Sequence, residues 1–155
     1  MNNMQNDKVI ASNRQVLRDY TIEKSYEAGI ELFGSEVKSI RAGKVNLKGS
    51  FARVDEGQVY VFNMHINPYE YSRDEIDAVR KRRLLLHKKE IHQIFGKLTQ
   101  KGYTLLPLKI YYKKRYVKIE IGLGKGKREY DKRHAIKEKQ ALREIKKGMA
   151  VEKGR

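Results

Sequence analysis

Cationic clusters interleaved with tyrosines are the most abundant source of chemistry in this sequence. The clusters occupy residues 80–83, residues 113–115, and Lys125, Lys127 and Arg128, each at a predicted loop or strand end. Lysine and arginine contact phosphates and release counterions, and exposed tyrosine rings stack on unpaired bases. The candidate stacking residues are Tyr69, Tyr71, Tyr111, Tyr112 and Tyr130. This pattern indicates nucleic-acid binding, although any one cluster alone is also typical of an ordinary solvated surface.

Residue types that do catalysis or bind metals form no such pattern. The histidines at 65, 87, 92 and 134 show no metal-ligand spacing such as HExxH, so we expect structural roles for them. No carboxylate pair comes with a nucleophile and an orienting third group. The chain has no cysteine, which excludes disulfides, thiolate nucleophiles and cysteine-based zinc sites. We therefore expect a protein that is not an enzyme and that uses no metal or cofactor.

A glycine-rich block at residues 122–127, GLGKGK, has some likeness to a nucleotide-binding loop. A P-loop needs the spacing GxxxxGK[ST], so that backbone N–H groups surround a phosphate and the hydroxyl reaches Mg²⁺. Here the third glycine is followed by Lys127 and Arg128, with no hydroxyl. The block is therefore predicted to be a hinge, or a place where the backbone approaches RNA.

The overall charge also indicates a polyanionic partner. The 155 residues carry 35 Lys+Arg against 19 Asp+Glu, a formal net charge of +16. Such an excess favours nucleic acid or an anionic membrane surface as partner. Nucleic acid is favoured, because the basic residues are spread along the chain and there is no acyl-anchor motif. The polar start lacks the apolar core of a signal peptide, and no apolar run approaches the ~20 residues of a membrane span. We therefore expect a soluble, cytoplasmic protein.

Short alternating stretches with turn signals predict a mainly β fold. Strands are expected at residues 20–24, 28–34, 51–54, 59–62, 104–112 and 116–121. Helices are expected at 35–43, with Ser35 as the cap and Gly43 at the end, and at 87–101, with its apolar face on a sheet. Such strands with a covering helix favour a small closed antiparallel barrel, which the pattern alone does not separate from a sandwich.

The domain organisation is predicted to have three parts. Residues 1–12 are expected to be a disordered start, 13–126 the barrel domain, and 127–155 a basic tail. In the tail, Leu142, Ile145 and Met149 fall at i, i+3 and i+7, which gives a thin apolar stripe. A helix with so narrow a stripe is marginal alone. We expect the tail to be disordered in isolation and to become helical on a partner.

Several blocks in a fixed order resemble one known family. They read YEAGI at 26–30, SEVKSIRAG at 35–43, HINPY at 65–69, RRLLLH at 82–87, KGYT at 101–104 and GKGKREYDKR at 124–133. In this order they are similar to the small protein B family, whose members partner transfer-messenger RNA. The resemblance runs from about residue 13 to residue 149, and the ordered set is far more specific than any single block.

The resemblance implies a role in ribosome rescue. It implies an oligonucleotide-binding barrel that holds the tRNA-like domain of transfer-messenger RNA and reaches stalled ribosomes with elongation factor Tu and GTP. It also implies that the tail enters the empty mRNA channel and stands in for a codon–anticodon helix. A general single-strand or ribosomal RNA-binding barrel with a basic tail is the alternative. A generic barrel has no reason to carry the YDKR block at 130–133.

The family's pattern also indicates site residues. By position, Glu27, Leu85 and Lys118 are implied on the RNA side of the barrel, although a core role for Leu85 stays open. Further RNA-binding candidates on the barrel are basic: Arg41, Arg82, Arg83, Lys125 and Lys127. The implied decoding-centre residues are Gly126, Tyr130, Asp131, Lys132, Arg133 and Lys137. The loop at 71–79 and the last residues, 150–155, match no block of the family.

Overall fold

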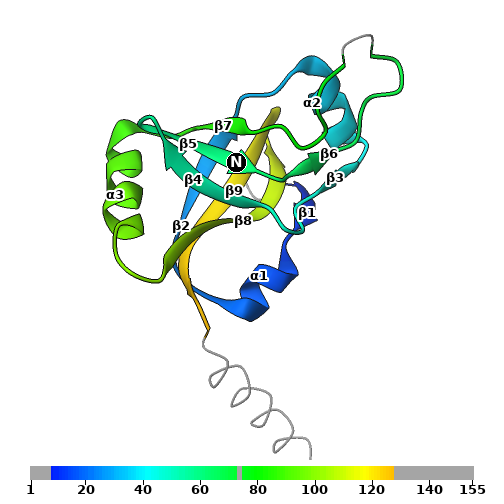
Figure 1. Ribbon diagram of the computed structural model, residues 1–155. Coiled ribbons are helices and arrows are strands. Elements are labelled where there is room, and N and C mark those ends of the chain that lie inside the picture. The colour runs from blue at the N-terminus through cyan, green and yellow to red at the C-terminus, as the bar shows by residue number, and fades with distance from the viewer. Residues whose placement is uncertain (1–7, 73–74, 128–155) are drawn as a thin grey trace, which may run out of the picture.

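A closed ring of antiparallel strands forms the body of the protein (Figure 1). The computed structural model describes residues 8–72 and 75–127. The strands are β1 Lys8–Ser12, β2 Tyr20–Ile30, β3 Val45–Asn46, β4 Phe51–Asp55, β5 Gln58–Phe62, β6 His65–Ile66, β7 Arg82–Leu85, β8 Tyr103–Lys113 and β9 Tyr116–Gly126. The helices are α1 Arg14–Asp19, α2 Gly34–Arg41 and α3 Lys88–Leu98.

The ring closes because two long strands share an edge. The order is β8-β4-β5-β7-β2-β9, and β9 pairs again with β8. Strand β9 is paired along nearly its whole length with both β2 and β8. On the other edge of β8, β4 pairs at Leu105 while β1 pairs over residues 109–112, so one edge serves two partners. Strands β3 and β6 form a separate two-stranded sheet.

The core fills the ring and is closed off by two helices. Ile119 and Ile121 of β9 point inward and are fully buried, as the alternation of this strand predicts. Ile40 of α2 and Ile94 of α3 join the same apolar cluster. In Figure 1, α2 lies near one end of the barrel and α3 along its side, with α1 near the other end. Together these elements hold β2, β7, β8 and β9 in a fixed register, which positions the surface described below.

The predicted fold class is confirmed: the chain is mainly β, with a closed antiparallel barrel and flanking helices. Both predicted helices are present, and Gly43 follows α2 with a φ of +76°. Four details differ. The cap of α2 is Phe33 rather than Ser35, and its N–H donates to Glu36 Oε1 at 2.9 Å. Residues 20–30 form one long strand, and α1 was not predicted. Phe95 lies on the outer side of α3, 56% exposed.

The start of the chain also differs from the prediction. Residues 8–12, expected to be disordered, form β1 and pair with β8. The reason is tertiary, because this segment finds free backbone groups on the edge of β8 that β4 does not cover, and its Ile10 and Ala11 pack against the core. Asn13 then fixes the start of α1, since its buried side chain donates to the carbonyls of Leu47 and Pro107, both at 3.3 Å.

The glycine-rich block is part of strand β9 and is not a hinge. Gly122 and Gly124 pair with β2 on one side and β8 on the other. A Cβ on Gly124 would lie 2.5 Å from the carbonyl oxygen of Thr21, and one on Gly122 would lie 2.8 Å from Leu108 Cδ1. These glycines are therefore needed because neighbouring strands approach closely, which is a common reason for glycine inside a strand.

Candidate nucleic-acid interface

Gly29 of β2 lies on the outer face of the barrel. Its neighbours Ala28 and Ile30 are buried in the core, so position 29 faces outward. Gly29 pairs with Lys118 of β9 on one side and with Leu85 of β7 on the other. Residues paired directly across antiparallel strands point to the same face. Lys118 and Leu85 therefore share this outer face, with only backbone between them.

Leu85 is an exposed residue of this face and not part of the core. Its side chain is 49% exposed, whereas the preceding Leu84 is fully buried. A Cβ on Gly29 would lie 3.3 Å from Leu85 Cδ1, so Leu85 leans over the glycine. Leu85 is therefore a surface residue rather than a core residue, and its apolar side chain lies on the same face as Lys118.

Glu27 lies two residues before Gly29 on the same strand and the same face. Its Oε2 accepts a short hydrogen bond from the Tyr111 hydroxyl, and Lys113 Nζ lies 3.3 Å from its Oε1. The hydrogen bond from Tyr111 is the main reason why the pKa of Glu27 lies below its ordinary value. Partial burial opposes this effect, and the charges of Lys113 and Lys118 add to it. Glu27 is thus an ionised acceptor at neutral pH, with Lys113 and Lys118 nearby and Glu120 paired opposite it on the same face.

We name Glu27, Gly29, Leu85, Tyr111 and Lys118 the Gly29 face. Its members come from β2, β7, β8 and β9, and they meet only because the ring closes. The arrangement offers a cation for a phosphate, a carboxylate for a hydrogen-bond donor and an exposed apolar side chain. Contacts of these kinds occur between proteins and folded RNA.

The other basic candidates lie elsewhere on the barrel. Lys125 is exposed near the far end of β9, with its Nζ 4.7 Å from the centroid of the Tyr103 ring. Lys127 follows at the end of the described chain, and its N–H donates to the Asp19 carbonyl at 2.9 Å. Arg41 is exposed at the C-terminal end of α2. Arg83 is partly exposed and pairs with Glu31 at 2.8 Å.

The prediction that Arg82 contacts RNA is wrong for this fold. Arg82 is fully buried, and its Nε donates to Glu36 Oε2 at 2.7 Å while its Nη1 donates to the Met64 carbonyl at 2.7 Å. Its basic neighbours are engaged too, because Arg80 also bonds Glu36 and Lys81 lies 3.5 Å from Asp55. The cluster at 80–83 therefore serves mostly internal contacts.

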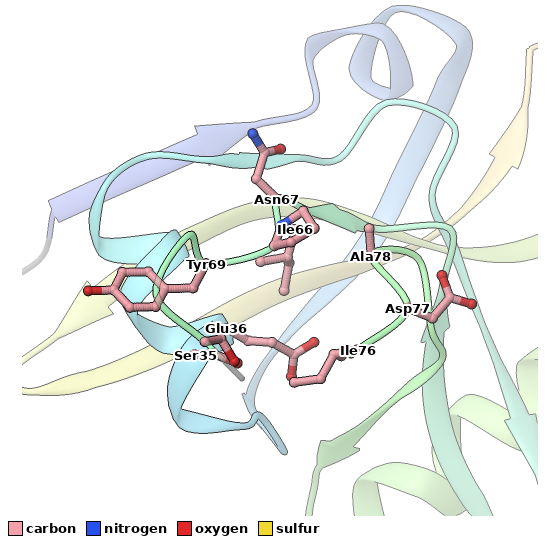
Figure 2. A pocket seen from close by; sticks show the side chains of 10 residues that line it. Ser35, Glu36, Ile66, Asn67, Tyr69, Ile76, Asp77 and Ala78 are labelled. Atoms are coloured by element: carbon pink, nitrogen blue, oxygen red, sulfur yellow. The ribbon is translucent and has the colours of Figure 1, made fainter. Parts of the chain in front are cut away.

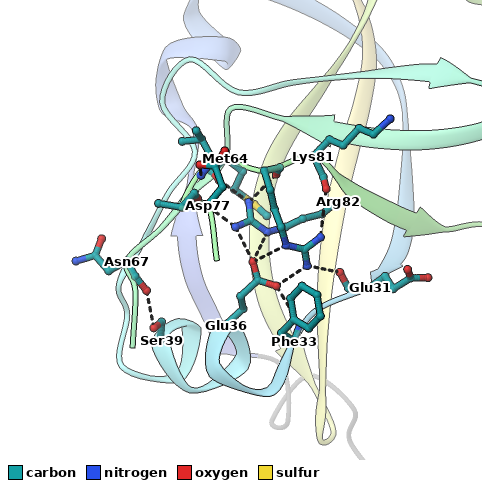
Figure 3. A network of polar contacts seen from close by, with 12 residues as sticks. Glu31, Phe33, Glu36, Ser39, Met64, Asn67, Asp77, Lys81 and Arg82 are labelled. Carbon is teal, nitrogen blue, oxygen red and sulfur yellow. Dashed lines mark hydrogen bonds and ion pairs between the residues drawn. The ribbon is translucent and has the colours of Figure 1, made fainter. Parts of the chain in front are cut away.

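Glu36 is the centre of this buried network, which we name the Glu36 clasp: Glu36, Arg80 and Arg82 (Figure 3). It ties the start of α2 to the segment that leads into β7. Burial alone would raise the pKa of Glu36, but hydrogen bonds from Arg80, the Phe33 N–H and Arg82 outweigh it. Together they hold the pKa of Glu36 below its ordinary value. The clasp therefore stabilises the fold, and the charges of its residues are paired with one another within the protein.

The two carboxylates that line a small pocket beside the clasp already have partners within the protein. The pocket is lined by residues of α2 and by residues 66–69, 72 and 76–78, with Glu36 and Asp77 among them (Figure 2). Glu36 is bonded to the clasp arginines, and Asp77 Oδ1 accepts from the Val79 N–H at 3.0 Å. The Asp77 contact thus helps to hold residues 77–79, which belong to a segment for which the sequence offered no role.

The tyrosines divide into buried and exposed groups. Tyr111 is 6% exposed, and Tyr112, on the other face of β8, is half-buried. Tyr71 is 76% exposed, and its ring meets the Tyr69 ring edge-on, with 5.5 Å between the centroids. Tyr69 and Tyr71 therefore remain candidates for stacking on a base, while Tyr111 acts through its hydroxyl. Tyr130, Asp131, Lys132, Arg133 and Lys137 lie outside the described residues.

Two further kinds of feature, metal sites and membrane-spanning helices, are absent from the part of the chain that the structure describes. Within residues 8–72 and 75–127, no three His, Cys, Asp or Glu side chains come together in a way that would hold a metal ion. Among the helices of the same residues, none is long and apolar enough to cross a bilayer.

Comparison with known proteins gives a family. The family model described as SmpB protein matches residues 10–151 of this chain. The chain belongs to the SmpB family. An SsrA-binding protein of Caldicellulosiruptor bescii is 56% identical over 149 residues, covering 95% of this chain and 94% of that protein. An SsrA-binding protein of Bacillus cytotoxicus is 56% identical over 139 residues, covering 89% and 90% of the two chains.

A solved structure shares the fold of this SmpB-family chain. The structure is described as "tmRNA-SmpB: a journey to the center of the bacterial ribosome". Its chain is 50% identical, with a TM-score of 0.65, and the match covers 81% of this chain and 93% of that one. The resemblance noted from the sequence blocks is thereby confirmed.

Sequence reasoning missed two parts of the site. It did not identify Gly29 as the position between Leu85 and Lys118 on this face, and it did not connect Glu27 with Tyr111. Alternation along residues 26–30 was a usable signal for the first, because it places Glu27 and Gly29 on one face. The second depends on the register between strands that are 84 residues apart in sequence, which no local pattern reveals.

Proposed function

We propose that this protein binds the tRNA-like domain of transfer-messenger RNA and brings it to stalled ribosomes, as a non-catalytic adaptor in the cytoplasm. The observation that carries the proposal is the Gly29 face. There, Glu27, Leu85 and Lys118, which the family resemblance singles out, lie together although they are far apart in sequence. The names of the relatives, SsrA-binding protein, and of the solved tmRNA-SmpB structure support the same function.

Four of the five members of the Gly29 face have a distinct role in this proposal. Lys118 contacts an RNA phosphate, and Leu85 packs against a ribose or base. Gly29 leaves room for the Leu85 side chain, because a Cβ at position 29 would lie 3.3 Å from Leu85 Cδ1. Glu27 accepts a hydrogen bond from a base or ribose donor, since a carboxylate does not attract phosphate. Arg41, Arg83, Lys125 and Lys127 add longer-range attraction for the polyanion.

The tail is proposed to act separately from the Gly29 face. Strand β9 runs from Tyr116 to Gly126, so Lys118 and Lys127 are separated by about 30 Å of extended chain. The tail residues Tyr130, Asp131, Lys132, Arg133 and Lys137 enter the empty mRNA channel and occupy the decoding centre. Gly126, which the sequence grouped with them, ends β9 paired with Tyr20 and marks the point where the tail leaves the barrel. An mRNA already in the channel excludes them sterically. Elongation factor Tu with GTP joins the complex through the RNA.

Replacing Lys118 with Ala tests the barrel's part of the proposal. We expect weaker binding to the tRNA-like domain and a salt slope lower by about one unit, because one phosphate contact is lost. The measurement is a gel-shift titration at several salt concentrations. Lys89→Ala is the matched control, because Lys89 is an exposed lysine of α3 outside the Gly29 face. An unchanged slope for Lys118→Ala would show that Lys118 does not contact the RNA.

A further inference from the structure

A carboxylate in the middle of an RNA-binding face needs an explanation. Glu27 sits in a protein of net charge +16 and faces the same side as Lys118. A carboxylate that moved freely there would repel nearby phosphates without selecting a hydrogen-bond donor. It contributes to recognition only if its oxygens are held in a fixed direction, because an acceptor selects its partner by geometry.

Tyr111 supplies that fixed direction. Its hydroxyl donates to Glu27 Oε2 from β8, across the intervening strand β9. The Tyr111 ring is 6% exposed, and Lys109 Nζ lies 5.2 Å from its centroid. Lys113 also reaches Glu27, but its side chain is 40% exposed and has a long flexible stem. The buried ring is therefore the rigid anchor, and Lys113 is the more mobile second contact.

We infer that Tyr111 is a positioning residue that orients Glu27 to accept a hydrogen bond from a base or ribose donor of the bound RNA. The inference rests on the proposed function and deepens it. A tyrosine hydroxyl is neutral, so it orients the carboxylate without cancelling the negative charge. A carboxylate has about four lone-pair sites, so positions remain for an RNA donor after the bonds to Tyr111 and Lys113.

The Tyr111→Phe variant tests this inference, with Tyr112→Phe as its matched control. The first change removes the hydroxyl that holds Glu27 and keeps the ring in place. The second removes a neighbouring hydroxyl that is buried and finds no hydrogen-bond partner within the described part of the chain. Both variants keep the charge and the aromatic packing of β8, so they differ in the contact with Glu27.

Two measurements are expected to separate the variants. In Tyr111→Phe, the pKa of Glu27, followed by NMR of its side-chain carboxyl, rises toward its ordinary value. Affinity for the tRNA-like domain falls about 3- to 10-fold, the range of one ordinary hydrogen bond, because Glu27 keeps its second contact with Lys113. The salt slope stays unchanged, because no cation is removed. Tyr112→Phe changes neither the pKa of Glu27 nor the affinity.

A double-mutant cycle decides whether Tyr111 acts through Glu27. On a Glu27→Ala background, Tyr111→Phe is expected to cause no further loss of affinity. Full loss on that background, or wild-type affinity of Tyr111→Phe alone, would overturn the inference. A wild-type protein with no preference for the tRNA-like domain would overturn the proposed function itself. The two failures are therefore distinguishable.

Discussion

Removal of residues 128–155 is expected to leave binding to the tRNA-like domain nearly intact and to abolish ribosome rescue. The barrel is complete without these residues, because β9 ends at Gly126 and the Lys127 N–H bonds the Asp19 carbonyl. The Gly29 face lies toward the other end of β9 and keeps every one of its residues. Gel-shift titration measures the first activity, and peptide tagging on stalled ribosomes in vitro measures the second.

A protein with residues 128–155 in scrambled order is the control for charge. It keeps all the cations of the tail but loses the order of residues 130–133, which the proposal places in the decoding centre. It should bind the RNA as well as the full chain does and should fail in rescue. Equal loss of both activities in the truncated protein would contradict the division of labour between barrel and tail.

Replacing Glu36 with Gln is expected to destabilise the fold by about 3 kcal/mol, as is usual when one partner of a buried ion pair is removed. Glu36 is 4% exposed and Arg82 is fully buried, so the change leaves a buried guanidinium without its counter-charge. Urea unfolding of both proteins measures the difference. Glu31→Gln is the matched control, because the Glu31–Arg83 pair is 60% and 38% exposed. Its expected loss is below about 1 kcal/mol.

The Glu36 clasp also predicts a pH dependence of stability. The pKa of Glu36 is lowered in the folded protein, so the clasp stabilises the fold fully above the carboxylate's unfolded pKa. That contribution is lost as the pH falls through the lowered folded value, where Glu36 gains a proton. Glu36→Gln should therefore reduce the loss of stability on acidification. A variant as stable as the wild type at neutral pH, with the same acid sensitivity, would show that the clasp contributes nothing.

Local sequence patterns predicted the strands in which buried and exposed side chains alternate. Ile119 and Ile121 alternate with polar residues, and both are buried in β9. The two larger helices were predictable because their apolar spacing and flanking glycines agree. Strand β1 was not predictable, because its pairing depends on an edge of β8 that only the folded barrel presents. The glycines at 122 and 124 indicated a hinge locally, whereas the close approach of Thr21 and Leu108 places them in a strand.

The site was only partly predictable for a similar reason. Arg82 sits in a run of four basic residues that is typical of a surface, and its partner Glu36 is 46 residues earlier. Leu85 could not be assigned from its leucine neighbours until strand β7 fixed Leu84 inside and Leu85 outside. Lys118 was placed correctly on the outer face, because alternation along β9 is strict there. Sequence patterns thus identified faces of single strands, while contacts between strands required the register of the closed ring.

A competition gel shift tests most directly whether the barrel recognises a folded, tRNA-shaped RNA. Labelled tRNA-like domain of transfer-messenger RNA is bound to the full chain at one fixed salt concentration. The competitors are the same RNA without label and an unstructured RNA of equal length. The account predicts that the unlabelled tRNA-like domain displaces the complex at an at least about tenfold lower concentration, since phosphate contacts alone do not discriminate. Equal displacement by the unstructured RNA would contradict it.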